Sequence, residues 1–192
     1  GGSSCSYEDI NPFWYRFTCF TSGSLGFIID PISSSDDYDW QIFDITGQNP
    51  NDVYTNNNAS MVIAANWSAR NGQTGTRNGG SGLVECCTIT GPGGQNPPNF
   101  SRMPNIFAGR TYLLMVSNFS SSQQGYKLSF GGGTAVITDP KLPLMQQVQP
   151  NCGGDELRLK LNKKMRCSSI SLDGSDIVGF PGGITATSIR TN

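Results

Sequence analysis

Hydrophobic and polar residues alternate along most of the chain in short runs, and turn-forming residues separate these runs. Alternation with a period of two is typical of β-strands that bury one face. It predicts strands over Pro12–Phe20, Leu25–Asp30, Asp39–Ile45, Ser60–Asn66, Leu83–Ile89 and Gly125–Phe130. Thr111–Ser117 is apolar on both faces, which predicts a central strand of a sheet.

Two long polar segments separate some of these strands. Thr46–Ser60 is rich in asparagine, and Asn66–Gly82 is rich in glycine, so both are predicted to be loops. A structureless segment as long as the second one is often functional or mobile. Many short strands joined by polar turns predict an all-β chain that begins with a jelly-roll sandwich of about eight strands.

A composition change near Gly131–Pro143 predicts the boundary between two domains. Glycines end the first unit, and two prolines open a linker. We therefore divide the chain into residues 1–134 and 135–192. In the second part Leu157, Leu159 and Leu161 alternate with basic residues, which predicts a half-buried strand. The tail carries about three or four predicted strands, whereas an immunoglobulin-like sandwich has about seven, so we expect it to be cropped or completed by a partner.

Composition narrows the class of protein. Charged residues make up 14% of the chain, well below the roughly 25% of ordinary domains, and the 24 glycines suit a secreted protein with many turns. The formal net charge of −1 argues against nucleic-acid binding, which favours a strongly basic face. The chain contains no apolar run of the roughly 18 residues that a membrane helix requires, so no membrane span is predicted.

Six cysteines point to an oxidising, extracellular location. An even number of cysteines in a turn-rich chain is typical of disulfide-supported secreted domains. The residues concerned are Cys5, Cys19, Cys86, Cys87, Cys152 and Cys167. Proximity in the sequence favours Cys5–Cys19 and Cys152–Cys167 bridges. The remaining two adjacent cysteines form a vicinal bridge or bond elsewhere.

Histidine is absent from the chain. Catalysis by Ser-His-Asp and Cys-His arrangements is therefore excluded, as are zinc sites that include histidine. Carboxylate chemistry, lysine chemistry and cations held by oxygen ligands remain possible. The three glutamates, Glu8, Glu85 and Glu156, lie in no catalytic signature, so we expect no enzyme activity.

Aspartates gather where the strand Asp39–Ile45 begins. Asp36, Asp37 and Asp39 could provide three carboxylates from one turn, and Asp44 or Asp30 would have to join from neighbouring strands. Calcium prefers six to eight oxygen ligands of this kind, so Asp36, Asp37, Asp39 and Asp44 are the candidate calcium ligands. The alternative is an acidic turn without metal, because aspartate and serine side chains also bond their own backbone in turns.

Aromatic residues suggest a second kind of site. Trp14 and Trp40 fall within strand patterns and are expected to pack in the sandwich. Trp67 falls within the glycine-rich segment and is the candidate for an exposed ring that stacks on a sugar.

The first unit resembles the bacterial pre-peptidase C-terminal domain, a small jelly roll. The segments that carry the likeness are WYRFTCFTSGSLGFII, DDYDWQIFD and RTYLLMVSNFSSSQQGYKLSF. The chain is still more similar to a repeated module of large cell-surface proteins of gliding, type IX-secreting Bacteroidota. There, runs like NPFWYRFTCF, ANWS and GYKLSFGGGTAVITDP occur in this order, and LRLKLNKKMRCSSISLDGSDI looks like the start of the following Ig-like domain.

The resemblance implies a jelly roll followed by a partial Ig-like domain at the cell surface. Collagen-binding modules related to this jelly roll use calcium. The family often has histidines near Arg110 and Asn118, which this chain lacks, and the type IX sorting domain is not in this sequence.

We therefore expect a noncatalytic structural or adhesive module of a cell-surface protein. Its partners would be other domains of the same long chain, neighbouring copies or surface glycans. One alternative is a fibre subunit completed by a neighbour's strand. Another is a glycan- or protein-binding accessory module of a secreted hydrolase.

Overall fold

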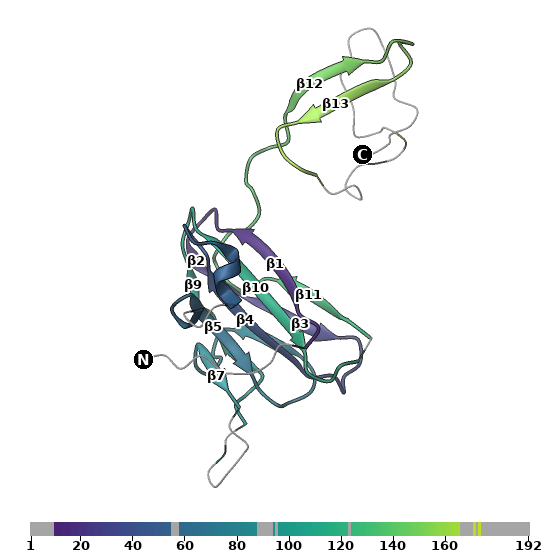
Figure 1. Ribbon diagram of the computed structural model, residues 1–192. Coiled ribbons are helices and arrows are strands. Elements are labelled where there is room, and N and C mark those ends of the chain that lie inside the picture. Colours follow the sequence, from purple (N-terminus) through teal and green to yellow (C-terminus); the bar gives the residue numbers. More distant parts are fainter. Residues whose placement is uncertain are drawn as a thin grey trace. The chain divides into compact units, whose positions relative to one another are not determined.

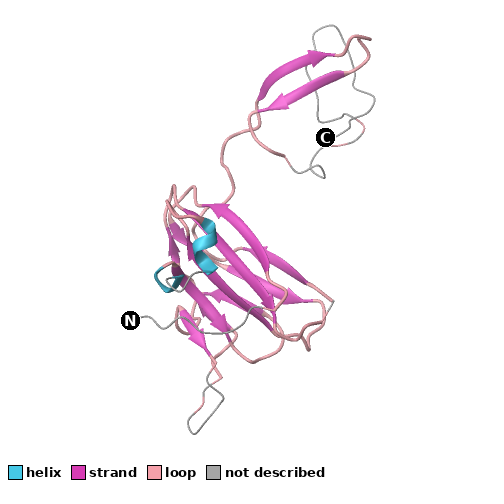
Figure 2. Ribbon diagram, viewed as in Figure 1, coloured by secondary structure: helices cyan, strands magenta, loops and turns pink. Residues whose placement is uncertain are grey.

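The computed structural model describes residues 10–54, 58–87, 94, 96–122, 124–165, 171 and 173. It divides into two compact units, Gly1–Asp139 and Pro140–Asn192 (Figure 1). Strands dominate the described residues, and the helices are two short 3-10 turns, η1 (Pro50–Tyr54) and η2 (Asn58–Ser60) (Figure 2). The prediction of an all-β chain is confirmed. Among the described residues no helix is long and apolar enough to cross a membrane.

Two sheets form the first unit as a β-sandwich. The first sheet has the order β1-β10-β4-β5-β7 and the second has the order β11-β3-β6-β8. Their strands are β1 (Phe13–Thr18), β3 (Phe27–Pro31), β4 (Tyr38–Asp44), β5 (Val62–Trp67), β6 (Thr74–Arg77), β7 (Val84–Cys86), β8 (Phe100–Arg102), β10 (Thr111–Asn118) and β11 (Tyr126–Phe130). A short pair, β2 (Gly23–Ser24) with β9 (Asn105–Ile106), lies apart from both. The chain crosses repeatedly between the two sheets, as in jelly-roll sandwiches.

Strand β10 is central in the first sheet. It pairs with β1 on one side and with β4 on the other, both antiparallel. Hydrogen bonds to both neighbours satisfy its backbone N–H and C=O groups, and both of its faces are covered. Seven of its eight residues are therefore buried. The apolar run Thr111–Ser117 predicted this position correctly.

The core between the two sheets is aromatic and aliphatic. Trp40 and Phe27 meet edge to face with ring centroids 4.9 Å apart. The Trp40 indole N–H donates to the Thr74 hydroxyl at 3.1 Å, which satisfies its polar atom inside the core. The fully buried side chains of this core include Phe27, Ile29, Trp40, Ile42, Ile106 and Leu114.

A second hydrophobic cluster covers the outer face of the first sheet. Phe43, Leu113 and Met115 contribute from the sheet, and Val53 closes the cluster from η1. Trp14 packs against Tyr54 of the same turn at 5.7 Å between ring centroids. The polar segment Thr46–Ser60, predicted to be a plain loop, therefore carries part of a core.

The first unit extends five residues beyond the predicted boundary at residue 134. Thr21 and Val136 form an isolated antiparallel bridge, and Ala135 and Ile137 pack against the inner core. Hydrophobic residues after the glycines thus belong to the first sandwich, and the division follows Asp139.

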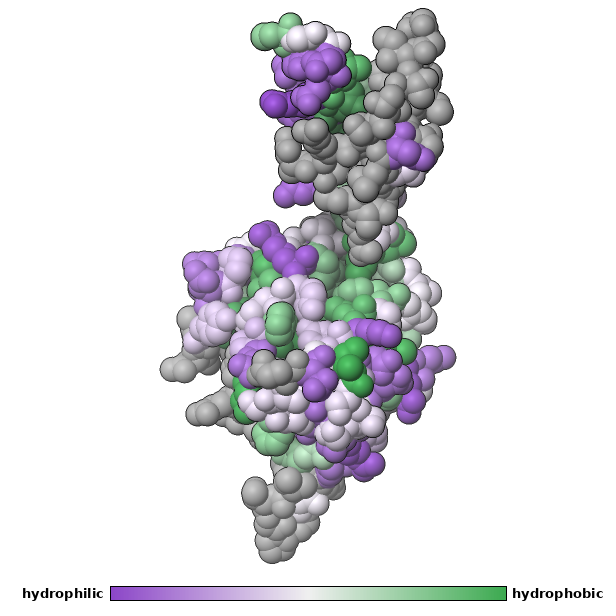
Figure 3. Space-filling model, turned by 90° about the vertical axis from the view of Figure 1, so that its right-hand side faces the viewer, coloured by the Kyte–Doolittle hydropathy of each residue, from purple (hydrophilic) through white to green (hydrophobic). Residues whose placement is uncertain are grey.

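The second unit contributes one described hairpin, β12 (Met145–Pro150) with β13 (Leu157–Leu161). Its register places Val148 opposite Leu159, and glutamines and basic residues face the other way. In Figure 3 hydrophobic side chains of this unit lie beside hydrophilic ones. The remaining strands of the expected Ig-like domain fall outside the described residues.

The predicted local disulfide pairs are wrong. Cys19 and Cys152 carry free thiols, whereas Cys86 is disulfide-bonded and is not bonded to Cys87, so no vicinal bridge forms. The physical reason at Cys19 is its position in the inner core, where its Sγ donates to the Thr21 carbonyl at 3.1 Å. Cys5 and Cys167 lie outside the described residues.

Candidate functional site

The acidic segment lies against the end of the central strand. In the register of β4 with β10, Asp39 lies opposite Ser117 and Tyr38 opposite Asn118. The Asp37 N–H donates to the Ser120 hydroxyl at 2.7 Å, and the Phe119 N–H donates to the Asp37 carbonyl at 2.9 Å. Hydrogen bonds of the Asp37 backbone therefore fix this turn to the loop that follows β10.

The side-chain contacts separate the three aspartates. Asp36 lies with Tyr38 beside Ser122 and Asn118, whereas Asp37 interacts with Asp39. The Ser122 hydroxyl donates to Asp36, and the Asn118 amide donates to the Tyr38 hydroxyl at 3.1 Å. Asp36 is thus a hydrogen-bonded turn residue, as expected if the acidic segment is a turn without a metal ion.

Asp37 and Asp39 form a buried carboxyl pair. They are 5% and 4% exposed, and one oxygen of each has no hydrogen-bond partner among the described residues. Burial raises the pKa of Asp37 to about 6. Burial, followed by repulsion from Asp37, raises the pKa of Asp39 to about 8. Charging both groups is unfavourable, so the pair requires a proton or a cation.

Asp44 does not belong to this group. It lies at the opposite end of β4, where its Oδ2 is 2.6 Å from a guanidinium nitrogen of Arg110 and its Oδ1 accepts from Thr46. Hydrogen bonds from Thr46 and the nearby guanidinium lower the pKa of Asp44. The structure thus joins two of the four predicted calcium ligands, and the described residues contain no cluster of three acidic, histidine or cysteine side chains fit for a metal.

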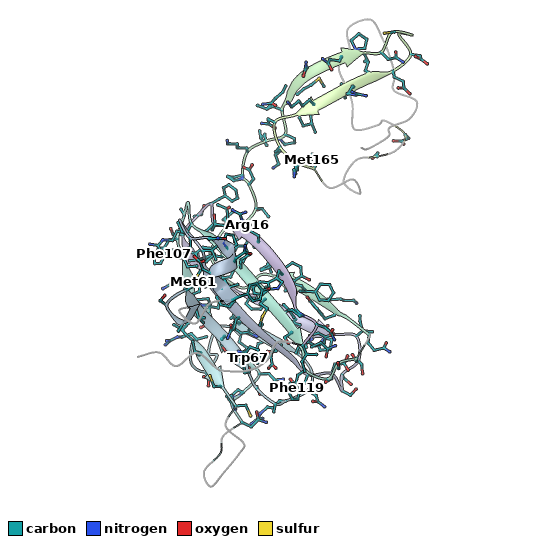
Figure 4. All side chains as sticks on the ribbon, in the orientation of Figure 1. Arg16, Met61, Trp67, Phe107, Phe119 and Met165 are labelled. Carbon is teal, nitrogen blue, oxygen red and sulfur yellow. The ribbon has the colours of Figure 1, made fainter. Side chains whose placement is uncertain are left out.

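Trp67 is not an exposed sugar-binding ring. It ends strand β5, is 4% exposed and packs in the cluster on the outer face of the first sheet with Phe43 and Met115. Figure 4 marks it on the sandwich. The prediction was wrong because β5 ends at Trp67, one residue beyond the predicted strand Ser60–Asn66.

A polar network holds the glycine-rich segment in place. The Asn99 amide donates to the backbone carbonyls of Arg70, Asn71 and Gln73 at 3.0 to 3.1 Å. The Ser68 hydroxyl donates to the Pro97 carbonyl at 2.6 Å. Sequence reasoning missed this network, because an asparagine that bonds three distant carbonyls looks like any turn asparagine.

The outer face of the second sheet is the other feature that sequence reasoning missed. Arg77 of β6 lies beside Arg102 of β8 in the register, and both are exposed. The Arg77 guanidinium lies 4.4 Å from the centre of the Phe100 ring. These residues are about 25 positions apart in the chain, so only the strand pairing joins them.

Comparison of the chain with protein-family models, with curated proteins and with solved structures gave no match. The candidate sites therefore stand on the geometry described above.

Proposed function

We propose that this chain is a noncatalytic structural and adhesive module of an extracellular, cell-surface protein. The observation that carries the proposal is the polar network around Asn99. In that network the Asn99 side chain bonds backbone carbonyls of the loop 68–73, which makes a rigid scaffold rather than a set of reactive groups. The disulfide at Cys86 supports an oxidising location.

Rigidity suits a module that spaces or presents neighbouring domains. The loop 68–73 is tied to residues 96–99 by Ser68 and Asn99, so few conformations are lost when a partner docks on it. The two-sheet core with interlocking aromatic rings keeps both outer faces at fixed positions.

The test is whether the chain adheres to extracellular polymers or proteins without hydrolysing them. Beads coated with the chain are exposed under flow to extracellular polysaccharides and surface proteins, and the same materials are assayed for hydrolysis products. We expect beads to be retained with no product released. Product formation that tracks the amount of chain, or retention no better than that of beads coated with unfolded chain, overturns the proposal. Light scattering of the free chain reveals a fibre if the chain assembles end to end.

We propose calcium binding as a second property, restricted to Asp37 and Asp39. The supporting observation is that each buried carboxyl has one oxygen without a partner among the described residues. Two carboxylates are too few to complete a calcium shell of six to eight oxygens, so water or backbone carbonyls must supply the others. Asp36 and Asp44 are no longer candidate ligands, because both are engaged elsewhere.

A further inference from the structure

The outer face of the second sheet concentrates positive charge. Residues 1–134 contain six basic side chains, and three of them lie on this face: Arg77, Arg102 and Lys127. The inward-facing neighbours Thr76, Ser101 and Leu128 fix this orientation, because side chains alternate along each strand. The strands of this sheet contribute one acidic residue, Asp30, although acidic residues outnumber basic ones nine to six in residues 1–134.

Two arginines occupy one end of the face. Arg77 and Arg102 are register partners on adjacent parallel strands, which lie about 4.8 Å apart. Neither forms an ion pair with an acidic side chain among the described residues. Like charges opposite one another are unfavourable unless an anion lies between them. The pair therefore favours a carboxylate or a sulfate, which a guanidinium binds with two hydrogen bonds.

A flat apolar strip follows the arginine pair. Ile28, Gly75 and Phe100 are aligned across three strands, and Ile28 is 38% exposed. Gly75 has a φ of 141°, and a Cβ there would lie 2.2 Å from the Phe27 carbonyl oxygen. Only glycine fits, so no side chain rises from the centre of the strip. Arg77 lies over the Phe100 ring, which holds its guanidinium at the edge of the strip.

Lys127 of β11 lies on the opposite side of the strip from the arginine pair. It is the register partner of Asp30, and Thr76, the residue before Arg77, is the partner of Phe27. Measured along the strands, Lys127 is therefore four residues, or about 13 Å, from the level of the arginines. No ion pair joins Lys127 to Asp30. The face thus presents cations on two sides of an apolar centre, a pattern that fits an extended polymer bearing anions at intervals and C–H groups between them.

We propose that this face binds an acidic polysaccharide, with its carboxylates or sulfates at Arg77, Arg102 and Lys127 and a sugar face on Ile28. The inference rests on the proposed adhesive function and gives it a ligand class. An anionic membrane fits less well, because interfacial binding needs protruding hydrophobic side chains and Phe100 is half-buried under an arginine.

Titration calorimetry of the whole chain with polygalacturonate and with dextran sulfate tests the proposal, with neutral dextran and anionic phospholipid vesicles as comparisons. We expect saturable binding to at least one acidic polymer that weakens as salt rises, and none to neutral dextran. The double variant Arg77→Ser, Arg102→Ser should bind at least tenfold more weakly. The matched double variant Arg16→Ser, Arg158→Ser removes the same charge from exposed strand residues elsewhere and should bind as the unchanged chain does.

Equal weakening in both double variants shows nonspecific attraction and overturns the proposal, as does binding to vesicles in preference to both polymers. Thermal unfolding of each variant establishes that the sandwich persists, and Arg102→Lys retains the charge if Arg102→Ser fails to fold. Beads that still adhere when coated with the Arg77→Ser, Arg102→Ser chain leave the adhesive function intact but remove this face from it. Beads that never adhere overturn the adhesive function itself.

Discussion

Asp37 and Asp39 flank Tyr38 at the start of β4 and direct two buried carboxyl groups to the same face of the sheet. The charge of Asp37 contributes to raising the pKa of Asp39 to about 8, above the usual 3.8. The acidic segment that looks like a three-carboxylate turn in the sequence is therefore a pair, with Asp36 engaged separately by Ser122.

This pair should make the fold more stable in mild acid than in base. Between about pH 4 and pH 8 folded Asp39 retains a proton that the unfolded chain has released, so the free energy of unfolding falls as pH rises through this window. One proton corresponds to about 1.4 kcal/mol per pH unit. Asp39→Asn should raise the melting temperature at pH 8 and flatten its pH dependence. Asp30→Asn, which removes one charge from the other sheet, should do neither, and an unchanged pH profile in Asp39→Asn contradicts the assignment.

Calcium should compete with that proton. At a hundredfold excess over its dissociation constant, calcium should stabilise the chain by about 2.7 kcal/mol, measured as a rise in melting temperature that a chelator reverses. The Asp37→Asn, Asp39→Asn chain should show no such rise, whereas Asp36→Asn should retain it. If calcium at millimolar concentration leaves the unchanged chain unaffected, the pair holds a proton only and the calcium proposal fails.

Gly75→Ala should severely destabilise the second sheet. The new methyl group meets the Phe27 carbonyl where β3 pairs with β6, and the backbone φ of 141° is unfavourable for alanine. Denaturant unfolding should show a loss of more than about 2 kcal/mol. Gly79→Ala is the matched control: its φ is 71° and its Cβ meets nothing within 4 Å, so it should lose only about 1 kcal/mol. Equal losses would mean that the steric contact is unimportant.

Asn99→Asp should release the loop that residues 68–73 form. An aspartate offers no amide donor to the carbonyls of Arg70, Asn71 and Gln73, and its oxygens repel them. We expect a loss of roughly 2 kcal/mol and faster proteolysis within this loop. Asn105→Asp, on an exposed strand residue, should change neither. A protected loop in Asn99→Asp would contradict the role of the network.

The thiols of Cys19 and Cys152 should differ sharply in reactivity. Cys152 is exposed, whereas Cys19 is buried in the inner core, and burial raises the pKa of the Cys19 thiol. Iodoacetamide should therefore modify Cys152 in the folded chain and Cys19 only after unfolding, as read by mass spectrometry of the peptides. Rapid modification of Cys19 in the folded chain would show that the core around it opens readily.

The strands were the part of the fold that local sequence determined. Alternation along Phe13–Thr18 and Tyr38–Asp44, and the continuous apolar run in Thr111–Asn118, reflect which faces of each strand are buried, and that information is local. The prediction failed for Trp67 and missed β6, β8 and β12. Strand β6 lies inside Asn66–Gly82, which was predicted to be a loop. One extra strand residue, short strands beside glycines and a glutamine-rich strand give no local signal.

Tertiary structure alone decided which residues meet. Strand pairing joins Arg77 to Arg102 and ties the loop 68–73 to Asn99, and strand register is a property of two strands rather than one. Packing also decided the state of Cys19. Its proximity to another cysteine in the sequence suggested a bridge, but it lies in the core of the sandwich with a free thiol. The sequence by itself thus determined an all-β chain with an acidic segment before β4, and long-range packing decided which carboxyls, arginines and thiols share a site.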